Sequence, residues 1–333
     1  MIEKKLELPS DKRRKRLIKI EVKTNPNYGK YPKERNIREL LQNGVINLDK
    51  PCGPTSHQID SWLKNILEVD KVGHGGTLDP NATGVLPIAM CDAARALQVL
   101  LSAGKEYIGI MKIHKKFNEN EILDICKNFV GDIYQIPPVR SAVKRVKRKR
   151  QIYYLNIIQI KNKEVLFRVG CESGTYIRTL CKDIGKKLKC GANLAELRRT
   201  RVGNLREKDS FILHDVKDAF IFWKEDEDEK MIRSIIQPME ILLDHVPKIV
   251  VRDSAVDAIC HGASLAVPGI SEIDTGIKKG DTAAVLTLKG EGVALVNTLM
   301  STEQMIQKDS GICANLERVL MNKGTYPSIW KKP

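Results

Sequence analysis

Residues 73–84 read GHGGTLDPNATG, a glycine-rich segment in the first third of the chain. Four glycines in twelve residues exclude a regular helix and a well-formed strand, so we predict an ordered loop. The loop lacks the Gly-Lys-Ser/Thr ending of a phosphate-binding P-loop and does not open a helix as a dinucleotide-binding G-x-G-x-x-G sequence does. It presents one carboxylate, Asp79, followed by Pro80. A catalytic role and a simple turn-capping role are both open to this aspartate.

The segments around this loop alternate between strand-like and helix-like patterns. Residues 45–48 are typical of a short strand, and the two prolines and one glycine of residues 50–54 predict a rigid loop after it. Thr55 and Gln58 have the spacing of a capping box, so we predict a helix that begins there and buries one apolar face. Further along we expect helices over 93–101 and 119–129, strands over 107–113, 152–160 and 164–171, and a helix that begins near 176–178.

A second arrangement of interest is Gly174-Thr175-Tyr176-Ile177-Arg178. Arg178 falls in the first turn of the predicted helix, where the helix dipole disfavours a cation. This placement suggests another task for the guanidinium, such as pairing with a carboxylate. The alternative is a surface arginine on an RNA-facing helix, and taken alone that is the simpler explanation.

The charge balance points to a polyanionic partner. The chain has 333 residues, of which 56 are Lys or Arg and 41 are Asp or Glu, so its formal net charge is +15. Nucleic acid complements such an excess, whereas the basic runs lack the apolar face of a membrane-surface helix. A solvated basic surface is the alternative. The runs are 12–16 in the N-terminal segment, then Lys144, Arg145, Lys147, Arg148, Lys149 and Arg150, then Arg198, Arg199, Arg201 and Arg206.

Several other classes of protein are disfavoured. No apolar run approaches the ~20 residues that span a bilayer, and the N-terminus lacks the apolar stretch of a secretory signal. The eight cysteines form no C-x-x-C pair and do not combine with the six histidines at zinc-ligand spacing. We therefore expect a cytoplasmic protein without disulfides, without a bound metal and without a membrane partner.

Four motifs, taken in order, closely resemble the TruB-type pseudouridine synthases. They read LDKPCGPTS at 48–56, GHGGTLDPNATGVL at 73–86, KEY at 105–107 and GTYIR at 174–178. Their details resemble the dyskerin-like branch of archaea and eukaryotes, which forms the catalytic subunit of H/ACA ribonucleoproteins. The pointers to that branch are Gly75-Gly76, RSAVKR at 140–145 and AELRRTR at 195–201. Since the long Lys-rich tail of eukaryotic members is missing, we expect an archaeal source.

The resemblance implies an α+β fold with a central, mostly antiparallel mixed sheet flanked by helices, plus a small PUA β-barrel. Residues 246–326, which include His261-Gly262-Ala263, resemble the PUA domain. We divide the chain into a basic N-terminal arm (1–40), a catalytic domain (41–246) and a PUA RNA-binding domain (247–333). We also expect the arm to pack on the PUA domain.

The resemblance further implies roles for single residues. Asp79 matches the catalytic aspartate, Arg178 the arginine that pairs with it, and Tyr107 the tyrosine that stacks on the target base. Tyr176 is expected beside the pocket, and Lys50 belongs to a motif that supports the active-site loops. The candidates for contact with substrate or guide RNA are His74, Lys50, Arg145, Arg148, Arg198, Arg199, His261 and Gly262.

These residues suit the isomerisation of uridine in RNA to pseudouridine. Uracil is detached from ribose, rotated and rejoined through carbon, so no group is transferred in or out and no cofactor is expected. An aspartate is ionised near neutral pH, and a neighbouring arginine holds it so when water is excluded. Extruding the base costs a few kcal/mol, which an aromatic face such as that of Tyr107 partly offsets. Attack on the ring, attack on the anomeric carbon and a glycal route all stay open.

In the dyskerin-like branch a guide RNA selects the uridine by base pairing, while the protein reads shape and backbone. The implied partners are an H/ACA guide RNA, a substrate rRNA or tRNA, and three small proteins: a Nop-type protein, a Gar-type protein and a kink-turn-binding ribosomal-like protein. One alternative is a guide-independent synthase that modifies the T-loop of tRNA. The bacterial enzymes of that kind carry an insertion that the short stretch at 110–121 lacks. Another alternative is an RNA-binding scaffold for ribosome assembly, which would tolerate Asp79→Asn.

Overall fold

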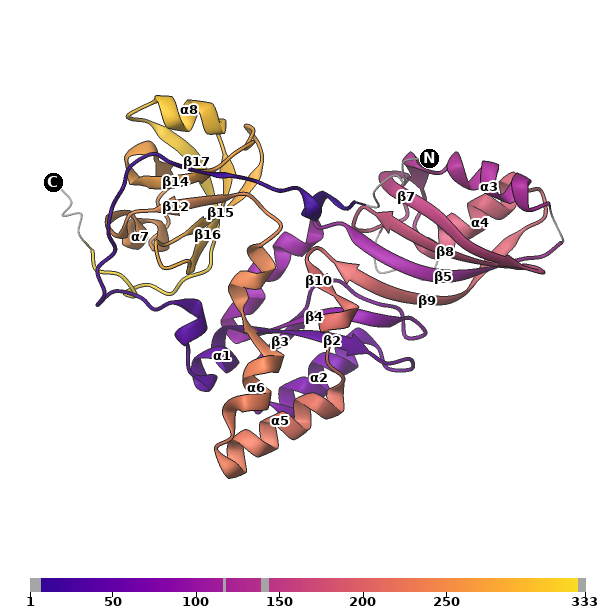
Figure 1. Ribbon diagram of the computed structural model, residues 1–333, viewed down its shortest axis with the longest axis horizontal. Helices are drawn as coiled ribbons and strands as arrows, with labels where there is room; N and C mark the ends of the chain where they lie inside the picture. The colour runs from indigo at the N-terminus through magenta and orange to yellow at the C-terminus, as the bar shows by residue number, and fades with distance from the viewer. Residues whose placement is uncertain (1–6, 116–117, 139–143, 329–333) are drawn as a thin grey trace.

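The computed structural model describes residues 7–115, 118–138 and 144–328. Within these ranges the strands form a larger sheet of ten strands and a smaller sheet of seven, with helices packed on both (Figure 1). Both sheets are mixed but mostly antiparallel, because each has a single parallel ladder among the described strands. The predicted α+β class with a mostly antiparallel central sheet is confirmed.

The larger sheet carries the glycine-rich segment. In spatial order its strands are β11 (Ile236–Pro238), β2 (Gly44–Lys50), β4 (Thr83–Met90), β9 (Ala192–Val202), β5 (Lys105–Ile113), β8 (Glu164–Cys171), β7 (Arg148–Lys161) and β6 (Gly131–Gln135), with β3 (Val72–His74) beside β4 and β10 (Leu205–Arg206) beside β9. The parallel contact between β4 and β9 pairs Thr83 with Arg198 and Gly84 with Arg199. This contact brings the end of the glycine-rich loop against the arginine-rich strand.

Helices cover the faces and ends of the sheets. The α-helices are α1 (Ile37–Asn43), α2 (Ser56–Ile66), α3 (Glu119–Lys127), α4 (Ile177–Lys187), α5 (Leu213–Asp226), α6 (Glu229–Ile235), α7 (Asp253–Cys260) and α8 (Thr302–Gln307). The 3-10 helices are η1 (Pro9–Asp11), η2 (Pro32–Glu34), η3 (Cys91–Leu101), η4 (Glu207–Asp209), η5 (Met239–Leu243) and η6 (Val267–Gly269). No helix in the described part of the chain combines the length and the apolar character needed to cross a lipid bilayer.

Two apolar clusters hold the helices on the larger sheet. One packs α1, α2, α5 and α6 against β2 and β4 and includes the fully buried Leu48, Ile59 and Leu63. The other packs α3 and α4 against β5 and β8 and includes Phe167 and Val169. Burial of one such side chain contributes about 1.5–3 kcal/mol. The helix predicted to begin near 176–178 is confirmed as α4, and its apolar side is buried through Ile177, Leu180, Cys181, Ile184 and Leu188.

Most predicted elements of this region are confirmed, with two corrections. The capping box is present, since the Thr55 hydroxyl accepts from the N–H of Gln58 and the N–H of Thr55 donates to Gln58 Oε1. The loop predicted over 73–84 is shorter, because residues at both of its ends join the sheet as β3 and the start of β4. The helix predicted over 93–101 begins at Cys91 and has the tighter 3-10 geometry.

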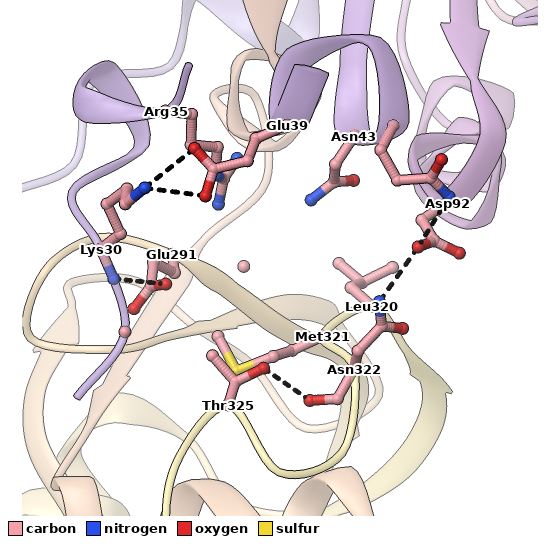
Figure 2. A pocket seen from close by; sticks show the side chains of 13 residues that line it. Lys30, Arg35, Glu39, Asn43, Asp92, Glu291, Leu320, Met321, Asn322 and Thr325 are labelled. Atoms are coloured by element: carbon pink, nitrogen blue, oxygen red, sulfur yellow. Dashed lines mark hydrogen bonds and ion pairs between the residues drawn. The ribbon is translucent and has the colours of Figure 1, made fainter. Parts of the chain in front are cut away.

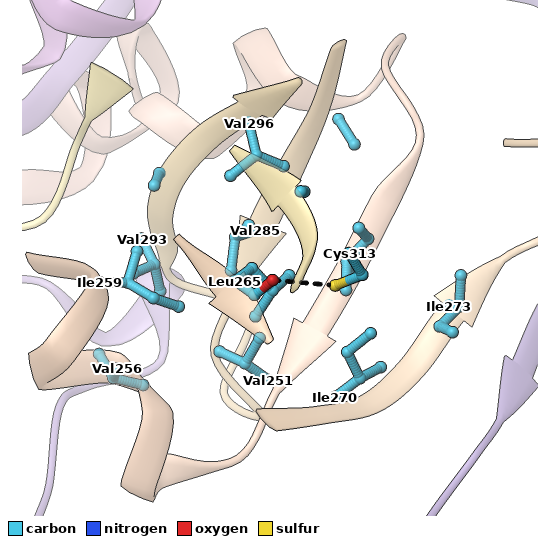
Figure 3. Close-up of a cluster of buried hydrophobic side chains, with 14 of the residues drawn as sticks. Val251, Val256, Ile259, Leu265, Ile270, Ile273, Val285, Val293, Val296 and Cys313 are labelled. Carbon is cyan, nitrogen blue, oxygen red and sulfur yellow. Dashed lines mark hydrogen bonds between the residues drawn. The ribbon is translucent and has the colours of Figure 1, made fainter. Parts of the chain in front are cut away.

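The smaller sheet encloses its own apolar core (Figure 3). Its strands, in spatial order, are β1 (Arg16–Ile18), β14 (Ile270–Asp274), β12 (Lys248–Val251), β15 (Thr282–Leu286), β16 (Gly292–Thr298), β17 (Ile312–Val319) and β13 (Leu265–Ala266). They curve around buried side chains that include Val251, Val285, Val296 and Cys313. A separate cluster joins Val99 and Leu243 of the larger half to Val250, Leu286 and Leu295 of these strands. The two halves therefore share apolar core on both sides of position 247.

The N-terminal segment runs along the smaller sheet before the chain enters α1 (Figure 1). Strand β1 pairs with β14, which places Arg16 opposite Asp274. Lys289 donates from Nζ to the carbonyl of Pro26 at 3.0 Å. Near the end of the segment, both terminal nitrogens of Arg35 lie 2.8 Å from the carboxylate oxygens of Glu240. This segment is thus held by a β-ladder and by charged groups of the body of the protein.

The last part of this segment, α1 and the smaller sheet enclose a polar hollow (Figure 2). Lys30 Nζ lies 2.8 Å from Glu39 Oε1, and the backbone N–H of Lys30 donates to Glu291 Oε1 at 3.0 Å. Across the hollow, Asn322 donates to Asp92 Oδ2 at 3.0 Å. The charged groups that line it are satisfied within the protein, and none of the predicted catalytic residues lines it.

Candidate active site

Asp79 and Arg178 meet at the surface of the larger sheet. Asp79 lies in the loop between β3 and β4, and Arg178 lies in the first turn of α4. Arg178 Nη2 is 3.0 Å from Asp79 Oδ2 and 3.2 Å from Oδ1. The two side chains are 49% and 40% exposed, so a substrate has access to both. The arginine that opposes the helix dipole therefore has a carboxylate partner.

Lys50 anchors the loop from beneath. Its side chain is fully buried, and Nζ donates to the carbonyls of Pro51 at 2.8 Å, Pro80 at 3.1 Å and Ala82 at 3.0 Å. Three acceptors match the three donors of an ammonium group. Burial lowers the pKa of Lys50, an effect that the nearby Asp79 partly offsets. The interpretation of Lys50 as an RNA-contacting residue is corrected, because its ammonium group is enclosed and bound to the loop backbone.

Ser56 and Gly53 add backbone anchors on either side of Asp79. The Ser56 hydroxyl donates to the carbonyl of Leu78 at 3.1 Å and lies 3.0 Å from the Leu78 nitrogen, whose N–H it accepts. The N–H of Gly53 donates to the carbonyl of Pro80 at 2.9 Å. Both neighbours of Asp79 in the chain are therefore fixed. Ser56 closes the LDKPCGPTS motif, but the motif alone did not indicate this anchoring role.

Arg199 supports the glycines of the loop from the adjacent strand. Its side chain is 1% exposed, and it donates from Nε to the carbonyl of Val85 at 2.7 Å and from Nη2 to the carbonyl of Gly76 at 2.9 Å. Burial lowers the pKa of this guanidinium. The structure corrects the expectation that Arg199 follows an RNA backbone, because the group faces the interior and binds carbonyl oxygens of the protein.

Lys105 and Tyr107 point to the same side of β5, as alternate residues of a strand do. Lys105 donates to Ser173 Oγ at 2.8 Å, and burial, assisted by the charge of Arg199, lowers its pKa to about 8. Tyr107 is 8% exposed and packs in the same apolar cluster as Leu78 of the loop. Burial raises the pKa of Tyr107. Its ring is therefore a neutral, largely enclosed surface beside the Asp79 loop.

Tyr176 is the N-cap residue of α4 and is half-buried. Its N–H donates to Gln135 Oε1 at 2.9 Å, and its carbonyl accepts from Gln135 Nε2 at 3.1 Å. This two-way contact fixes the start of the helix that carries Arg178. Gln135, at the end of β6, is a support that no sequence motif indicated.

His74 lies where β3 enters the loop, and its side chain is 8% exposed. Nδ1 is 2.7 Å from Asp60 Oδ2 on α2, and Nε2 is 3.2 Å from Thr77 Oγ1. Asp60 was missed by the sequence analysis, since nothing in the helix pattern marks it. The imidazole thus connects α2 to the residue two positions before Asp79.

Arg198 is clamped by two carboxylates. Its terminal nitrogens donate to both oxygens of Asp49, at 3.0 and 2.7 Å, and Nε donates to Glu207 at 2.8 Å. Hydrogen bonding to Asp49 is the main cause that raises the pKa of this arginine. The side chain is 37% exposed, so contact of Arg198 with RNA phosphates stays a prediction.

The other predicted RNA contacts lie at accessible places. Arg145 is exposed and donates from Nε to the carbonyl of Pro137 at 3.3 Å, and Arg148 begins β7. His261 and Gly262 follow α7 at the edge of a surface pocket. Their contact with RNA stays a prediction. Residues 140–143 of the RSAVKR motif lie outside the described residues.

Comparison with known domain families covers almost the whole chain. The N-terminal domain of the TruB family of pseudouridylate synthases matches residues 64–121 and 113–177, and the tRNA pseudouridylate synthase B C-terminal domain matches 178–244. The PUA domain matches residues 247–320, and the DKCLD (NUC011) domain matches 3–60.

Similarity to named relatives and solved structures extends over nearly the whole chain. The probable tRNA pseudouridine synthase B of Methanopyrus kandleri is 53% identical over 97% of this chain and 96% of its own length. The protein of the same name from Methanocaldococcus jannaschii is 49% identical over 100% of this chain and 99% of its own length. A chain solved in a Cbf5-Nop10-Gar1 complex has a TM-score of 0.92 and 50% identity, with 96% of this chain and 98% of that one covered. A chain of an H/ACA RNP bound to a substrate RNA containing 2'-deoxyuridine has a TM-score of 0.91 and 48% identity, with 97% of this chain and 100% of that one covered.

Proposed function

Because the chain belongs to the TruB family of pseudouridylate synthases, we propose that it isomerises uridines of RNA to pseudouridine at positions selected by an H/ACA guide RNA. Asp79 is the nucleophile in this proposal, and Arg178 orients its carboxylate. The observation that carries it is the accessible 3.0 Å pair between Asp79 Oδ2 and Arg178 Nη2. The family and the PUA domain expected from the sequence motifs are confirmed.

The geometry suits a reaction in which the protein must hold one anion still. The N1–C1' glycosidic bond of uridine breaks and a C5–C1' bond forms. C5 loses its proton to solvent and N1 takes one up, so the product is an isomer of the substrate and no second substrate is needed. Asp79 supplies the anionic oxygen. The loop that carries it is fixed by Lys50, Ser56 and Arg199, so little reorganisation is needed when the base arrives.

The side chains around Asp79 position the substrate and the elements of the site in this proposal. Tyr107 offers an aromatic face to the extruded base, which offsets part of the few kcal/mol that unstacking costs. Tyr176 fixes the start of α4, and His74 contacts the substrate strand near the flipped nucleotide. The ring of Tyr107 packs in the apolar cluster that contains Leu78 of the loop, while its hydroxyl lies near Arg199.

We propose the partners from the complexes that contain similar chains. The solved Cbf5-Nop10-Gar1 complex indicates a Nop-type and a Gar-type protein, and a kink-turn-binding protein on the guide RNA completes the set. His261 and Gly262 of the PUA domain hold the ACA end of the guide, and Arg145 and Arg148 contact phosphates. We place the complex in the cytoplasm of an archaeal cell.

Guide-independent modification of tRNA is the second candidate. Relatives that are 49–53% identical over nearly the whole chain carry the name probable tRNA pseudouridine synthase B, which favours this activity as an additional one. The two candidates share the Asp79 site and differ in what presents the uridine.

Release of tritium from uridine labelled at C5 tests both candidates. The substrates are an rRNA fragment, with and without a matching H/ACA guide and the small partner proteins, and a tRNA without a guide. We expect guide-dependent release from rRNA and no release with Asp79→Asn. Release from tRNA alone, without a guide, would replace the guide-dependent proposal with the second candidate. No release from any substrate would favour an RNA-binding scaffold.

A further inference from the structure

His57, Asp60 and His74 form a compact cluster beside the candidate active site. His57 and Asp60 lie one turn apart on α2, and His74 comes from β3. One potential ligand atom from each of the three lies within 4.8 Å of the others. We propose that these three side chains bind a divalent transition-metal ion, for which Zn²⁺ is the reference case.

The distances within the cluster are close to those of a metal site. His74 Nδ1 is 2.7 Å from Asp60 Oδ2, and His57 Nδ1 is 3.8 Å from the same oxygen. Ligands at about 2.0–2.2 Å from a tetrahedral Zn²⁺ are about 3.3 Å apart, so these two separations lie on either side of the required value. The two imidazole rings have their centroids 5.0 Å apart. A rotation of the exposed His57 side chain would bring its nitrogen to the ion.

The donor set also fits the chemistry of such ions. Imidazole nitrogens suit zinc, copper and nickel, and a carboxylate completes a three-ligand site that leaves a position for water. Asp60 has a further oxygen to offer, because no hydrogen-bond partner of its buried Oδ1 is found within residues 7–115, 118–138 and 144–328. A bound cation would use a carboxylate that is only partly satisfied in the fold.

The surroundings provide both a second shell and an entry path. Metal-binding histidines usually donate their other ring N–H to a nearby acceptor, and His74 Nε2 lies 3.2 Å from Thr77 Oγ1. His57 is 83% exposed, so an ion can enter from solvent without an opening of the core. A bound ion would link α2 to β3. It would also bind His74, the residue that contacts the substrate strand in the proposed function.

Titration of the metal-free, full-length protein with Zn²⁺ by calorimetry, and with Co²⁺ by visible absorption, tests the site without reference to activity. We expect one equivalent of each ion to bind, with Co²⁺ bands typical of nitrogen and oxygen ligands. His57→Gln should weaken Zn²⁺ binding at least about tenfold, the smaller of the losses that even second-shell changes cause. Because His57 is exposed, this variant should fold as the wild type does. His214→Gln, which removes another exposed histidine, is the matched control and should bind unchanged.

Three results would overturn the proposal. They are the absence of saturable binding to the wild type, equal affinity of His57→Gln and the wild type, and a thiolate-to-cobalt charge-transfer band, which would assign the ion to a cysteine. Asp60→Asn provides a second variant, and it should weaken binding while it leaves the two imidazoles in place. Since these readouts measure binding alone, failure of the metal site and failure of the proposed isomerisation are separate results.

Discussion

Arg178 Nη2 lies 3.0 Å from Asp79 Oδ2, although 99 positions separate the two residues along the chain. The pair is about half exposed, whereas Lys50 and Arg199 beneath the same loop are enclosed. An exposed ion pair contributes about 0–1 kcal/mol to folding. The pair is therefore better explained by the reaction proposed for Asp79 than by a contribution to stability.

Replacement of Arg178 by Gln should separate these two roles. We expect the rate of tritium release to fall by about 10²-fold, because Asp79 loses the charge that orients it. The midpoint of thermal unfolding should stay close to that of the wild type. Lys186→Gln removes an exposed pair with Asp183 on the same helix and serves as the control. A full rate in Arg178→Gln would contradict the assignment.

Lys50→Met should damage the fold and the reaction together. The substitution removes the shared donor of three carbonyl groups, one in a buried contact and two in part-buried contacts, so we expect the free energy of unfolding to fall by about 3 kcal/mol. The activity should fall as well, since two of those carbonyls belong to the Asp79 loop. Urea denaturation measures the first effect, with the exposed Lys64→Met on α2 as the control. Equal stability of the two variants would show that Lys50 is not an anchor.

The sequence predicts contacts well where the partners are near in the chain or belong to a known motif order. The capping box of Thr55 and Gln58 needs only a spacing of three residues. The pairing of Asp79 with Arg178 could be expected because both lie in motifs whose order resembles one family. Neither inference requires knowledge of how the strands are aligned.

The direction of the basic side chains could not be predicted in the same way. Arg198 and Arg199 are neighbours on β9, and successive residues of a strand point to opposite faces. One therefore meets Asp49 and Glu207, whereas the other enters the interior. A basic run shows the excess of charge, but the register of the sheet decides which members are free to bind RNA. Asp60 was missed for a related reason, since its partner His74 comes from another element.

Gly84→Ala should be far more harmful than Gly53→Ala. Both glycines have positive φ angles, +99° and +111°, so an alanine is strained at either position. At Gly84 the added Cβ would also lie 2.2 Å from the carbonyl oxygen of Arg199, whereas at Gly53 it meets no atom within 4 Å. We expect a loss of about 1–2 kcal/mol at Gly53 and at least about 4 kcal/mol at Gly84. Similar losses in denaturant titrations would show that the close approach of β4 and β9 is not required.

Removal of the N-terminal segment should weaken the whole protein. A chain that begins at Asn36 loses β1 and the partner of Glu240, a carboxylate held by Arg35 in a mostly buried pair. We expect the free energy of unfolding to fall by at least about 3 kcal/mol, because an unpaired buried charge remains. The control is a chain that begins at Glu7 and keeps these contacts. If both shortened chains unfold at the same urea concentration, the segment does not stabilise the smaller sheet.

Lys105 should give the stability a distinctive dependence on pH. Burial lowers its pKa in the folded protein to about 8, whereas an unfolded chain has a lysine pKa of about 10.4. Between these values the unfolded chain keeps a proton that the folded chain releases, so rising pH favours the folded state. We expect the free energy of unfolding of the wild type, relative to Lys105→Met, to increase by about 2 kcal/mol between pH 8 and pH 10 and to be constant below pH 7. Lys112→Met, on the exposed side of the same strand, should show no such increase. A constant difference for Lys105→Met across this range would mean that the folded protein keeps Lys105 charged, with its hydrogen bonds to Leu100 and Ser173 sufficient to offset the cost of burial.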